Sequence, residues 1–431
     1  MAKNANNKVS IWQSLHNAWK VQDIRKKLIY TFLMLILFRL VGVIPAPGVD
    51  YVRVKSAMSG SNLPLLDLVN MMTGSNFSNM TIMAMGITPY INSSIIMQLL
   101  TIAIPALERL SKSGPEGQKK IASITRYVTV VLAVIQAIGL VYSLGYIKSG
   151  WFNTVQVGVS MAAGTALAMW IGERITEKGL GNGVSLLIFA GIISNLFNGF
   201  TSLIANAFSA TSLTPWLTLL AVLLFALVMI VVVTFVDMGV RRIQVQYAKR
   251  VTGRKMYGGQ SSILPLKVCS VGVMPLIFAY SFMAFPSTLI QLFGGSESGL
   301  GLWWSRYMNY YSPLYMIVTA LLIIAFTYFY TSISFQPDEM AKNIQQQGGV
   351  IPHVRPGKPT ADFLARTNNR LTLFAALFLA VLATLPNLFT VGLQTSVPFA
   401  ASSLLIAVSV VLETKRQLDD LLVSRNYDTL T

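Results

Sequence analysis

Long apolar runs separated by short polar and charged stretches recur along the whole chain. A bilayer core about 30 Å thick needs roughly 20 apolar residues for each spanning helix. Runs of about this length, bounded by charges or by Gly and Pro clusters, predict ten membrane spans. The predicted spans are 28–44, 80–104, 124–146, 154–172, 183–203, 214–236, 268–293, 312–335, 371–391 and 398–413. The runs are continuous rather than alternating, which disfavours a barrel, and we predict an all-α polytopic membrane protein.

The composition agrees with a chain that lies in lipid. Of its 431 residues 54% are hydrophobic and 11% are charged, and the mean hydropathy is +0.60. A single cysteine, Cys269, excludes an intramolecular disulfide, and we interpret it as a small buried apolar residue. The two histidines, His16 and His353, lie far apart in the sequence, so we expect no metal site and no cofactor.

The net charge of +17 is distributed by topology. Of 33 Lys and Arg residues, 28 lie in the N-terminal arm, the even-numbered connections and the C-terminal tail. Four lie in odd-numbered connections and one, Arg39, inside the first span. The positive-inside rule then predicts a multi-pass membrane protein with both termini in the cytoplasm. The surplus charge in loops 237–267 and 336–370 needs a separate explanation.

The ends of the chain are predicted to be cytoplasmic. The arm 1–27 carries Trp12, Leu15 and Trp19 among basic residues, which predicts an amphipathic helix on the inner leaflet. It lacks the pattern of a cleaved signal peptide. The tail is predicted to comprise residues 414–431.

Two pairs of short matches indicate an internal repeat. Gly86-Ile-Thr-Pro89 in the second span matches Gly272-Val-Met-Pro275 in the seventh, and Ser-Leu-Leu-Ile occurs at 185–188 and at 403–406. These are the second and last spans of two five-helix halves, 28–203 and 204–413. Because five is odd, the second half must be inverted, and a functional site is expected between the halves near the midplane. Pro89 and Pro275 are interpreted either as repaired kinks or as hinges.

A short helical pattern lies between the first two spans. Residues 63–74 begin with Leu-Pro and end with Gly, which is typical helix punctuation, but they are too few to cross the bilayer. They are either a re-entrant half-helix or an external cap, and the alternative is an extracellular amphipathic loop lying on lipid.

Arg39 is the one charge well inside a predicted span, which makes a proton or ion relay improbable. We expect it to be satisfied by a nearby carbonyl or by a carboxylate of a companion helix. Enzyme signatures fail as well: residues 179–183 are rich in Gly but join two helices, which predicts a tight turn, and Gly357-Lys358 is followed by Pro359 rather than Ser or Thr. We therefore predict that the chain is not an enzyme.

The two basic loops carry patterns of their own. Basic residues between Arg241 and Lys255 alternate with Val245, Tyr247 and Tyr257, which predicts a hairpin that projects into the cytosol. The second loop holds Arg355 in a proline-stiffened turn, Ile351 to Gly357. Each loop is either a docking site for an acidic partner or RNA phosphates, or a merely solvated positive loop.

In combination and order, the sequence motifs resemble those of the SecY/Sec61 alpha family of protein-translocation channels. The matching segments are Phe38-Arg39, Ile44 to Gly48, Gly86 to Leu100, Thr176 to Ser185, Arg241 to Ile243, Tyr247 to Arg250, Leu264 to Val268 and Ile351 to Gly357.

The resemblance implies a pore shaped like an hourglass, closed at its waist by an apolar ring. The matching ring positions are Ile87, Ile91, Val184, Ile188, Ile277 and Ile406. It implies a plug at 64–76, with the apolar residues Leu65, Leu66, Leu68, Val69, Met71 and Met72. The second, third, seventh and eighth spans would form a lateral gate to lipid. Docking of a motor or ribosome would use Arg241, Arg242, Lys249, Arg250 and Arg355.

The implied function is passage of unfolded secretory polypeptides across the bacterial plasma membrane, with lateral release of apolar segments into lipid. The implied partners are SecE-like and SecG-like small membrane subunits, the SecA motor ATPase, the ribosome, signal peptides and nascent chains, and the lipid bilayer. Two other hypotheses stay open: an ion-coupled small-solute transporter built on inverted repeats, and an RNA-binding membrane anchor.

Overall fold

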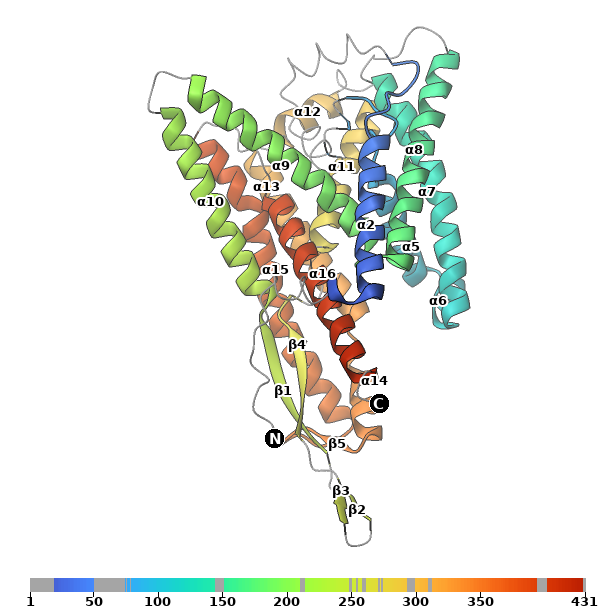
Figure 1. The fold of residues 1–431 in the computed structure, drawn as a ribbon, viewed down its shortest axis with the longest axis vertical. Coiled ribbons are helices and arrows are strands. Elements are labelled where there is room, and N and C mark those ends of the chain that lie inside the picture. The colour runs from blue at the N-terminus through green and yellow to red at the C-terminus, as the bar shows by residue number, and fades with distance from the viewer. Residues whose placement is uncertain are drawn as a thin grey trace. The chain divides into compact units, whose positions relative to one another are not determined.

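The computed structural model describes residues 19–49, 74, 76–77, 79–143, 151–209, 214–247, 250–252, 255–257, 261–269, 272, 274–292, 299–308, 312–393 and 401–428 (Figure 1). Every predicted span contains a long helix. These helices are α2 (Gln22–Val41), α5 (Thr88–Ala103), α7 (Pro115–Ser143), α8 (Trp151–Lys178), α9 (Gly183–Ser209), α10 (Thr214–Asp237), α11 (Met274–Leu292), α13 (Pro313–Ser334), α15 (Lys358–Leu393) and α16 (Ala401–Asp428). The short helices α6 (Pro105–Lys112), α12 (Gly299–Tyr307) and α14 (Pro337–Gln346) were not predicted.

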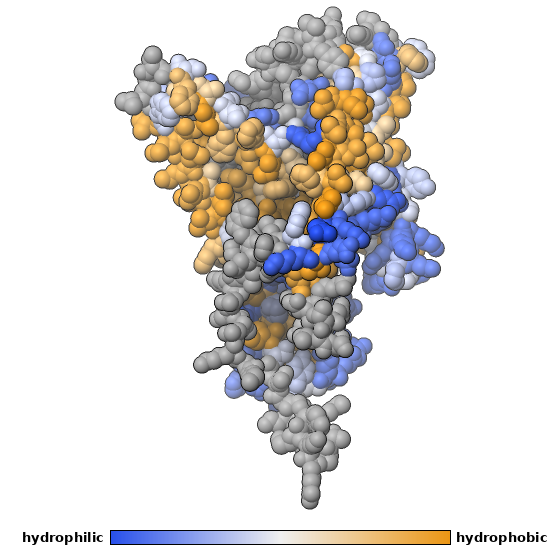
Figure 2. All heavy atoms as spheres, in the orientation of Figure 1, coloured by the Kyte–Doolittle hydropathy of each residue, from blue (hydrophilic) through white to orange (hydrophobic). Residues whose placement is uncertain are grey.

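The helices have the length and surface of a polytopic membrane protein. Among the described residues, six helices are long and apolar enough to cross a bilayer, and seven if α5 and α6, bent by 102°, form one span. Large apolar side chains lie on the surface of α10, where Leu220 and Leu227 are each 64% exposed. This surface is orange in Figure 2. The prediction of an all-helical polytopic membrane protein is confirmed.

The chain divides into two compact units. Unit 1 comprises Met1–Trp216, Ala284–Tyr310 and Ile406–Thr431, and unit 2 comprises Leu217–Met283 and Tyr311–Leu405. This division follows contacts within the described chain rather than the predicted halves 28–203 and 204–413, which stay a prediction.

In unit 1, helix α8 packs against α2, α5, α7 and α9. Glycines allow the close approaches. A Cβ at Gly164 would overlap the carbonyl oxygen of Ile82, and one at Gly183 would overlap the carbonyl oxygen of Gly172. Small residues at helix contacts let backbones approach closely, which is a common way of packing helices in lipid.

One predicted boundary is wrong in an instructive way. Residues 80–87 of the predicted span 80–104 form turns and, at Thr81, a single bridge to Pro45, and α5 begins at Thr88. The turns are closed by N–H donors to the third residue before them, as from Gly86 to Met83 at 2.9 Å. Two bonds tie this segment to the chain after α2: Ala46 N–H to Met80 O at 3.1 Å and Ile82 N–H to Ile44 O at 3.0 Å. Within a bilayer such non-helical backbone is tolerated where protein surrounds it.

The paired prolines begin helices rather than kink them. Pro89 is the second residue of α5 and Pro275 the second residue of α11. Each follows a glycine with positive φ, Gly86 at 52° and Gly272 at 62°. Proline is favoured in the first helical turn because its missing N–H has no helical partner there. The interpretation of both as mid-helix kinks is therefore wrong, although the two sites are alike in structure as well as in sequence.

The predicted hairpin between α10 and α11 is confirmed. Strand β1 (Val240–Tyr247) pairs antiparallel with β4 (Ser261–Lys267), with Arg242 opposite Pro265. Strands β2 (Arg250–Thr252) and β3 (Lys255–Tyr257) pair nearby. The strand β5 (Gly349–Val350), from the other basic loop, adds to β1 and gives the order β4-β1-β5. Within unit 2, β1 and β4 continue beyond the lower end of α10 in Figure 1, and the first turns of α15 pack against them.

Candidate functional site

Two of the predicted ring residues lie where α5 begins. Ile87 is the residue before the helix, and Ile91 is one turn further on, with its N–H donating to Ile87 O at 3.1 Å. Their side chains are 6% and 8% exposed. Residues four apart lie on the same side of a helix, so this pair presents one aliphatic face directly after the irregular segment.

A second aliphatic pair begins α9 in the same way. Val184 and Ile188 are one turn apart, and Ile188 is 5% exposed. The preceding turn is tight, as predicted, with Gly181 at a φ of 84°. Asn182 ends this turn and accepts the Ser185 N–H at its Oδ1 at 3.2 Å, as an N-cap residue does.

The last two ring residues lie on other helices. Ile277 is buried in α11 in unit 2, and Ile406 is buried in α16 in unit 1. Next to Ile277, Phe278 makes edge contacts with Phe326 and Tyr330 of α13, with centroids 6.1 and 5.7 Å apart. The structure therefore brings Ile87 together with Ile91, and Val184 with Ile188, each as neighbours on one helix.

Several predicted site residues lie outside the described residues. These are the N-terminal arm to residue 18, the plug residues Leu65, Leu66, Leu68, Val69, Met71 and Met72, and Lys249. The end of the predicted plug range is described at Gly74 and Asn76. The Gly74 carbonyl accepts a hydrogen bond from Arg39 Nη1 at 3.1 Å. Of the two partners expected for Arg39, the structure thus provides the carbonyl.

The segment after Gly74 is deeply buried. Phe77, Met80, Met83 and Ala84 are all 0% exposed. Asn76 is 4% exposed, and its Nδ2 has no hydrogen-bond partner among the described residues. A buried donor without an acceptor costs about 1–3 kcal/mol, so the amide of Asn76 destabilises a segment that is otherwise well packed. Sequence reasoning missed it because an uninterrupted apolar run has the composition of a spanning helix.

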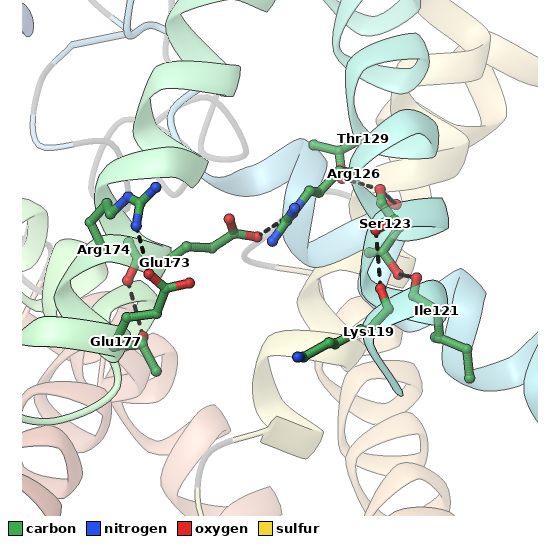
Figure 3. A network of polar contacts seen from close by, with 12 residues as sticks. Lys119, Ile121, Ser123, Arg126, Thr129, Glu173, Arg174 and Glu177 are labelled. Carbon is green, nitrogen blue, oxygen red and sulfur yellow. Dashed lines mark hydrogen bonds and ion pairs between the residues drawn. The ribbon is translucent and has the colours of Figure 1, made fainter. Parts of the chain in front are cut away.

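An ion pair joins α7 to α8. Arg126 Nε donates to Glu173 Oε1 at 2.7 Å, and Figure 3 shows the two side chains reaching toward each other between the helices. Arg174 pairs along α8 with Glu177 at 2.8 Å and lies 5.7 Å from the ring of Trp170. The sequence pattern did not indicate these contacts, since 47 residues separate Arg126 from Glu173.

The two basic loops share one apolar core in unit 2. Its buried members come from β1, β4, the Ile351 turn and α15, and they are Ile243, Val245, Leu266, Ile351 and Leu364. Arg241, Arg242 and Arg355 are exposed beside this core. Arg250 lies on β2, near the far end of the hairpin. The predicted docking residues of two separate loops therefore belong, apart from this far end, to one folded body.

Thr360 holds the turn that carries Arg355. Its Oγ1 donates to Arg355 O at 2.8 Å, and the side chain is 2% exposed. His353 in the same turn has a φ of 65°, a conformation that is uncommon outside glycine. The conformation of the turn is therefore defined by a buried hydrogen bond and by an unusual backbone angle. The sequence pattern indicated Arg355 but not Thr360.

Metal chemistry finds no support in the described part of the chain, where no group of three His, Cys, Asp or Glu residues could hold an ion. Cys269 is a half-buried free thiol whose Sγ lies 3.8 Å from Gly272 O.

Known structures resemble this fold over most of its length. A protein-conducting channel matches with a TM-score of 0.69 and 20% identity, covering 92% of both chains. Sec61 in the canine ribosome–channel complex from the endoplasmic reticulum matches with a TM-score of 0.63 and 17% identity, again covering 92% of both. The fold is that of a protein-conducting channel.

Sequence relatives identify the family. The protein translocase subunit SecY of Streptomyces scabiei is 41% identical and covers 95% of this chain and 98% of the relative. That of Halalkalibacterium halodurans is 40% identical, over 97% and 99%. The sequence profile named SecY matches residues 81–415. The chain belongs to the SecY family, the protein-conducting channel subunits of the Sec translocase.

Three predictions are confirmed by this family membership: the channel function, the absence of an enzymatic role, and the multi-pass membrane location. The bacterial relatives imply the plasma membrane.

Proposed function

We propose that unfolded secretory polypeptides cross the membrane through an aliphatic constriction in this chain, formed by Ile87, Ile91, Val184, Ile188, Ile277 and Ile406. The observation that supports this most is the placement of the pairs Ile87/Ile91 and Val184/Ile188. Each pair begins a helix directly after non-helical backbone. Discontinuous helices in membrane transport proteins commonly form the functional site near the midplane.

Aliphatic side chains suit such a constriction. A narrow apolar ring dewets and blocks ions, while its side chains can yield around a passing polypeptide without holding it. A polar ring would retain water and pass ions. The plug at 64–76 is proposed to close the external side of the same pore.

Lateral release is the second part of the proposal. The gate helices would be α5, α7, α11 and α13, the helices of the second, third, seventh and eighth predicted spans. A Leu at a helix centre favours lipid by roughly 0.5 kcal/mol, whereas Lys or Arg disfavours it by about 3 kcal/mol. About 20 apolar residues would therefore leave sideways, and polar chains would pass through.

The shared sheet of unit 2 is the proposed docking body for the SecA motor or the ribosome. Its exposed cations are Arg241, Arg242 and Arg355, and Arg250 lies on β2. Lys249, which lies outside the described residues, is included from the sequence. A rigid base loses little entropy when an arginine engages a carboxylate or phosphate partner. SecE-like and SecG-like subunits would accompany the chain. Both termini of the chain itself would be cytoplasmic.

The constriction is tested by ion conductance. Ile188→Ser and Ile277→Ser should raise the conductance of the resting channel, because a hydroxyl retains water in the ring. Leu224→Ser, at a 63% exposed position on α10, is the matched control and should leave the conductance unchanged. Single-channel recordings without a change in either ring variant would contradict the assignment.

The docking body is tested by charge reversal. Arg355→Glu should impair motor-driven export while the chain stays folded, because the cation is exposed and its turn is held by backbone contacts. Arg306→Glu, on the exposed surface of α12, is the control. Normal export by the Arg355 variant would exclude the docking role.

A further inference from the structure

Arg39 places a guanidinium group in the mostly apolar part of α2 that follows Lys27. The residues on either side of it in α2, Phe38 and Leu40, are apolar, and Arg39 is half-buried. Its Nη1 donates to the backbone carbonyl of Gly74, 35 residues further along the chain. A charge in a spanning helix is costly and is usually kept for a function, so this bond needs an explanation beyond helix packing.

Gly74 is held on two sides. Its φ is 70°, a conformation that favours glycine. A Cβ there would lie 2.7 Å from Arg39 Nη1 and 2.9 Å from the Cα of Gly191 in α9. The backbone of Gly74 is therefore wedged between α2 and α9, and another side chain at this position would separate it from both.

The held residue begins the buried segment that leads into α5. Asn76 packs closely against Gly42 of α2, and Thr81 N–H donates to Asn76 O at 3.2 Å. From there the chain runs through turns, passes Gly164 of α8 at Ile82, and reaches Ile87. This stretch has no continuous helical ladder of its own, so its position depends on such external contacts.

These contacts point to a role for Arg39 in the pore. We infer that Arg39 is a positioning residue: by holding Gly74 against α9 it fixes the largely buried segment 80–87, and with it the first turn of α5, where Ile87 and Ile91 keep the resting channel closed to ions. The inference rests on the proposed constriction and adds a residue that contributes no side chain to it. The Asn76 Nδ2, which has no hydrogen-bond partner among the described residues, favours displacement of the segment, and the charged hydrogen bond opposes it.

The test compares two replacements of Arg39 in the full-length channel in lipid bilayers. Arg39→Met removes the donor at similar length and should raise the resting ion conductance about tenfold or more, since a hydrogen bond from a charged donor contributes at least that factor to a two-state equilibrium. Arg39→Lys keeps a donor and should restore most of the closure.

A matched control lies on the same helix. Thr31 of α2 accepts the Leu180 N–H at its Oγ1 at 3.0 Å, so Thr31→Val also removes a buried contact of α2 but leaves Gly74 untouched. It should not change the conductance. Gly74→Ala should mimic Arg39→Met, and the double variant should be no leakier than either alone, because both disturb one contact. Conductance of Arg39→Met equal to wild type, with Ile188→Ser leaky, would overturn the inference and leave the constriction standing.

A second readout does not depend on the constriction. In a chain with Cys269→Ser, the thiol of Ile87→Cys should react faster with a membrane-impermeant reagent when Arg39→Met is added. If Arg39→Met leaves the labelling rate of Ile87→Cys unchanged, the inference is overturned. This holds whether or not the ring variants alter the conductance. Faster labelling together with unaltered ring variants would contradict the constriction alone.

Discussion

Two regions of this molecule depart from the helix, and they do so by different means. The segment 80–87 is mostly apolar, largely buried and held by close backbone contacts, whereas the sheet β4-β1-β5 is amphipathic and has one buried face. In lipid the polar groups of the backbone need partners within the protein, and turns with two bonds to residues 44–46 provide them. The sheet is stabilised mainly by the burial of alternate side chains on one face. Substitutions should therefore destabilise the two regions for different reasons: loss of buried volume in the sheet, and added volume at the close backbone contacts of the segment.

The largest effect is expected in the sheet. Leu364 is 0% exposed in the core that joins both basic loops, so Leu364→Ala should destabilise the sheet by about 2–5 kcal/mol through lost burial and a cavity. Hydrogen exchange of the β1 and β4 amides measures this. Ile263→Ala, at a 51% exposed position on β4, is the control and should cost less than about 0.5 kcal/mol. Equal protection loss in both would mean that the shared core does not support the sheet.

The buried segment should respond to added rather than removed volume. Gly164→Ala places a methyl group against the Ile82 carbonyl, and we expect a loss of about 1–3 kcal/mol, seen as a lower thermal midpoint of the purified channel. Gly299→Ala adds the same methyl group where no atom of the described residues lies within 4 Å. A midpoint for Gly164→Ala as high as that of Gly299→Ala would show that α8 does not define the path of the segment.

A smaller effect should separate the fold of the docking body from the presentation of Arg355. Thr360→Val removes the hydroxyl that donates to Arg355 O and should cost about 1 kcal/mol, while Thr360→Ser keeps the donor. Motor-driven export should fall in the valine variant and recover in the serine variant. Loss of export in both would assign the defect to packing of the threonine methyl group.

The smallest effect is expected at the ion pair between α7 and α8. Arg126 and Glu173 are partly exposed, with side chains 46% and 25% accessible, so Glu173→Gln should cost about 0.2–1 kcal/mol. Glu177→Gln breaks a pair within α8 and serves as the control, because it joins no second helix. The difference between the two thermal midpoints should shrink as salt is added. A difference that persists at high salt would point to a contact other than the ion pair.

The comparison also explains what the sequence could predict. The hairpin was predictable because Val245 and Tyr247 alternate with polar residues, and a period of two is typical of a strand with one buried face. The turns before Thr88 were not, because a buried irregular segment and a spanning helix have the same apolar composition. Gly86 and Pro89 marked a boundary there, but the same residues are tolerated within membrane helices.

The hydrophobic pattern of the sequence could not predict which distant residues pair with each other. A carbonyl partner for Arg39 was one of two expectations, yet nothing in the sequence distinguishes Gly74 from other candidates. The addition of β5 to β1 rests on two residues, Gly349 and Val350, which are too few to show a period. The constriction and the plug were identified through the family resemblance and stay proposals about individual residues.

The central claim is that a polypeptide passes the aliphatic residues at the start of α5. A photo-crosslinker at Ile91 in the full channel, engaged with a stalled secretory chain that lacks a membrane segment, tests it most directly. We predict an adduct from Ile91 and none from Leu220, which lies 64% exposed on α10. Two results would contradict passage of the polypeptide past Ile91. One is the absence of the Ile91 adduct in complexes that have engaged the secretory polypeptide, and the other is an equal yield of adducts at both positions.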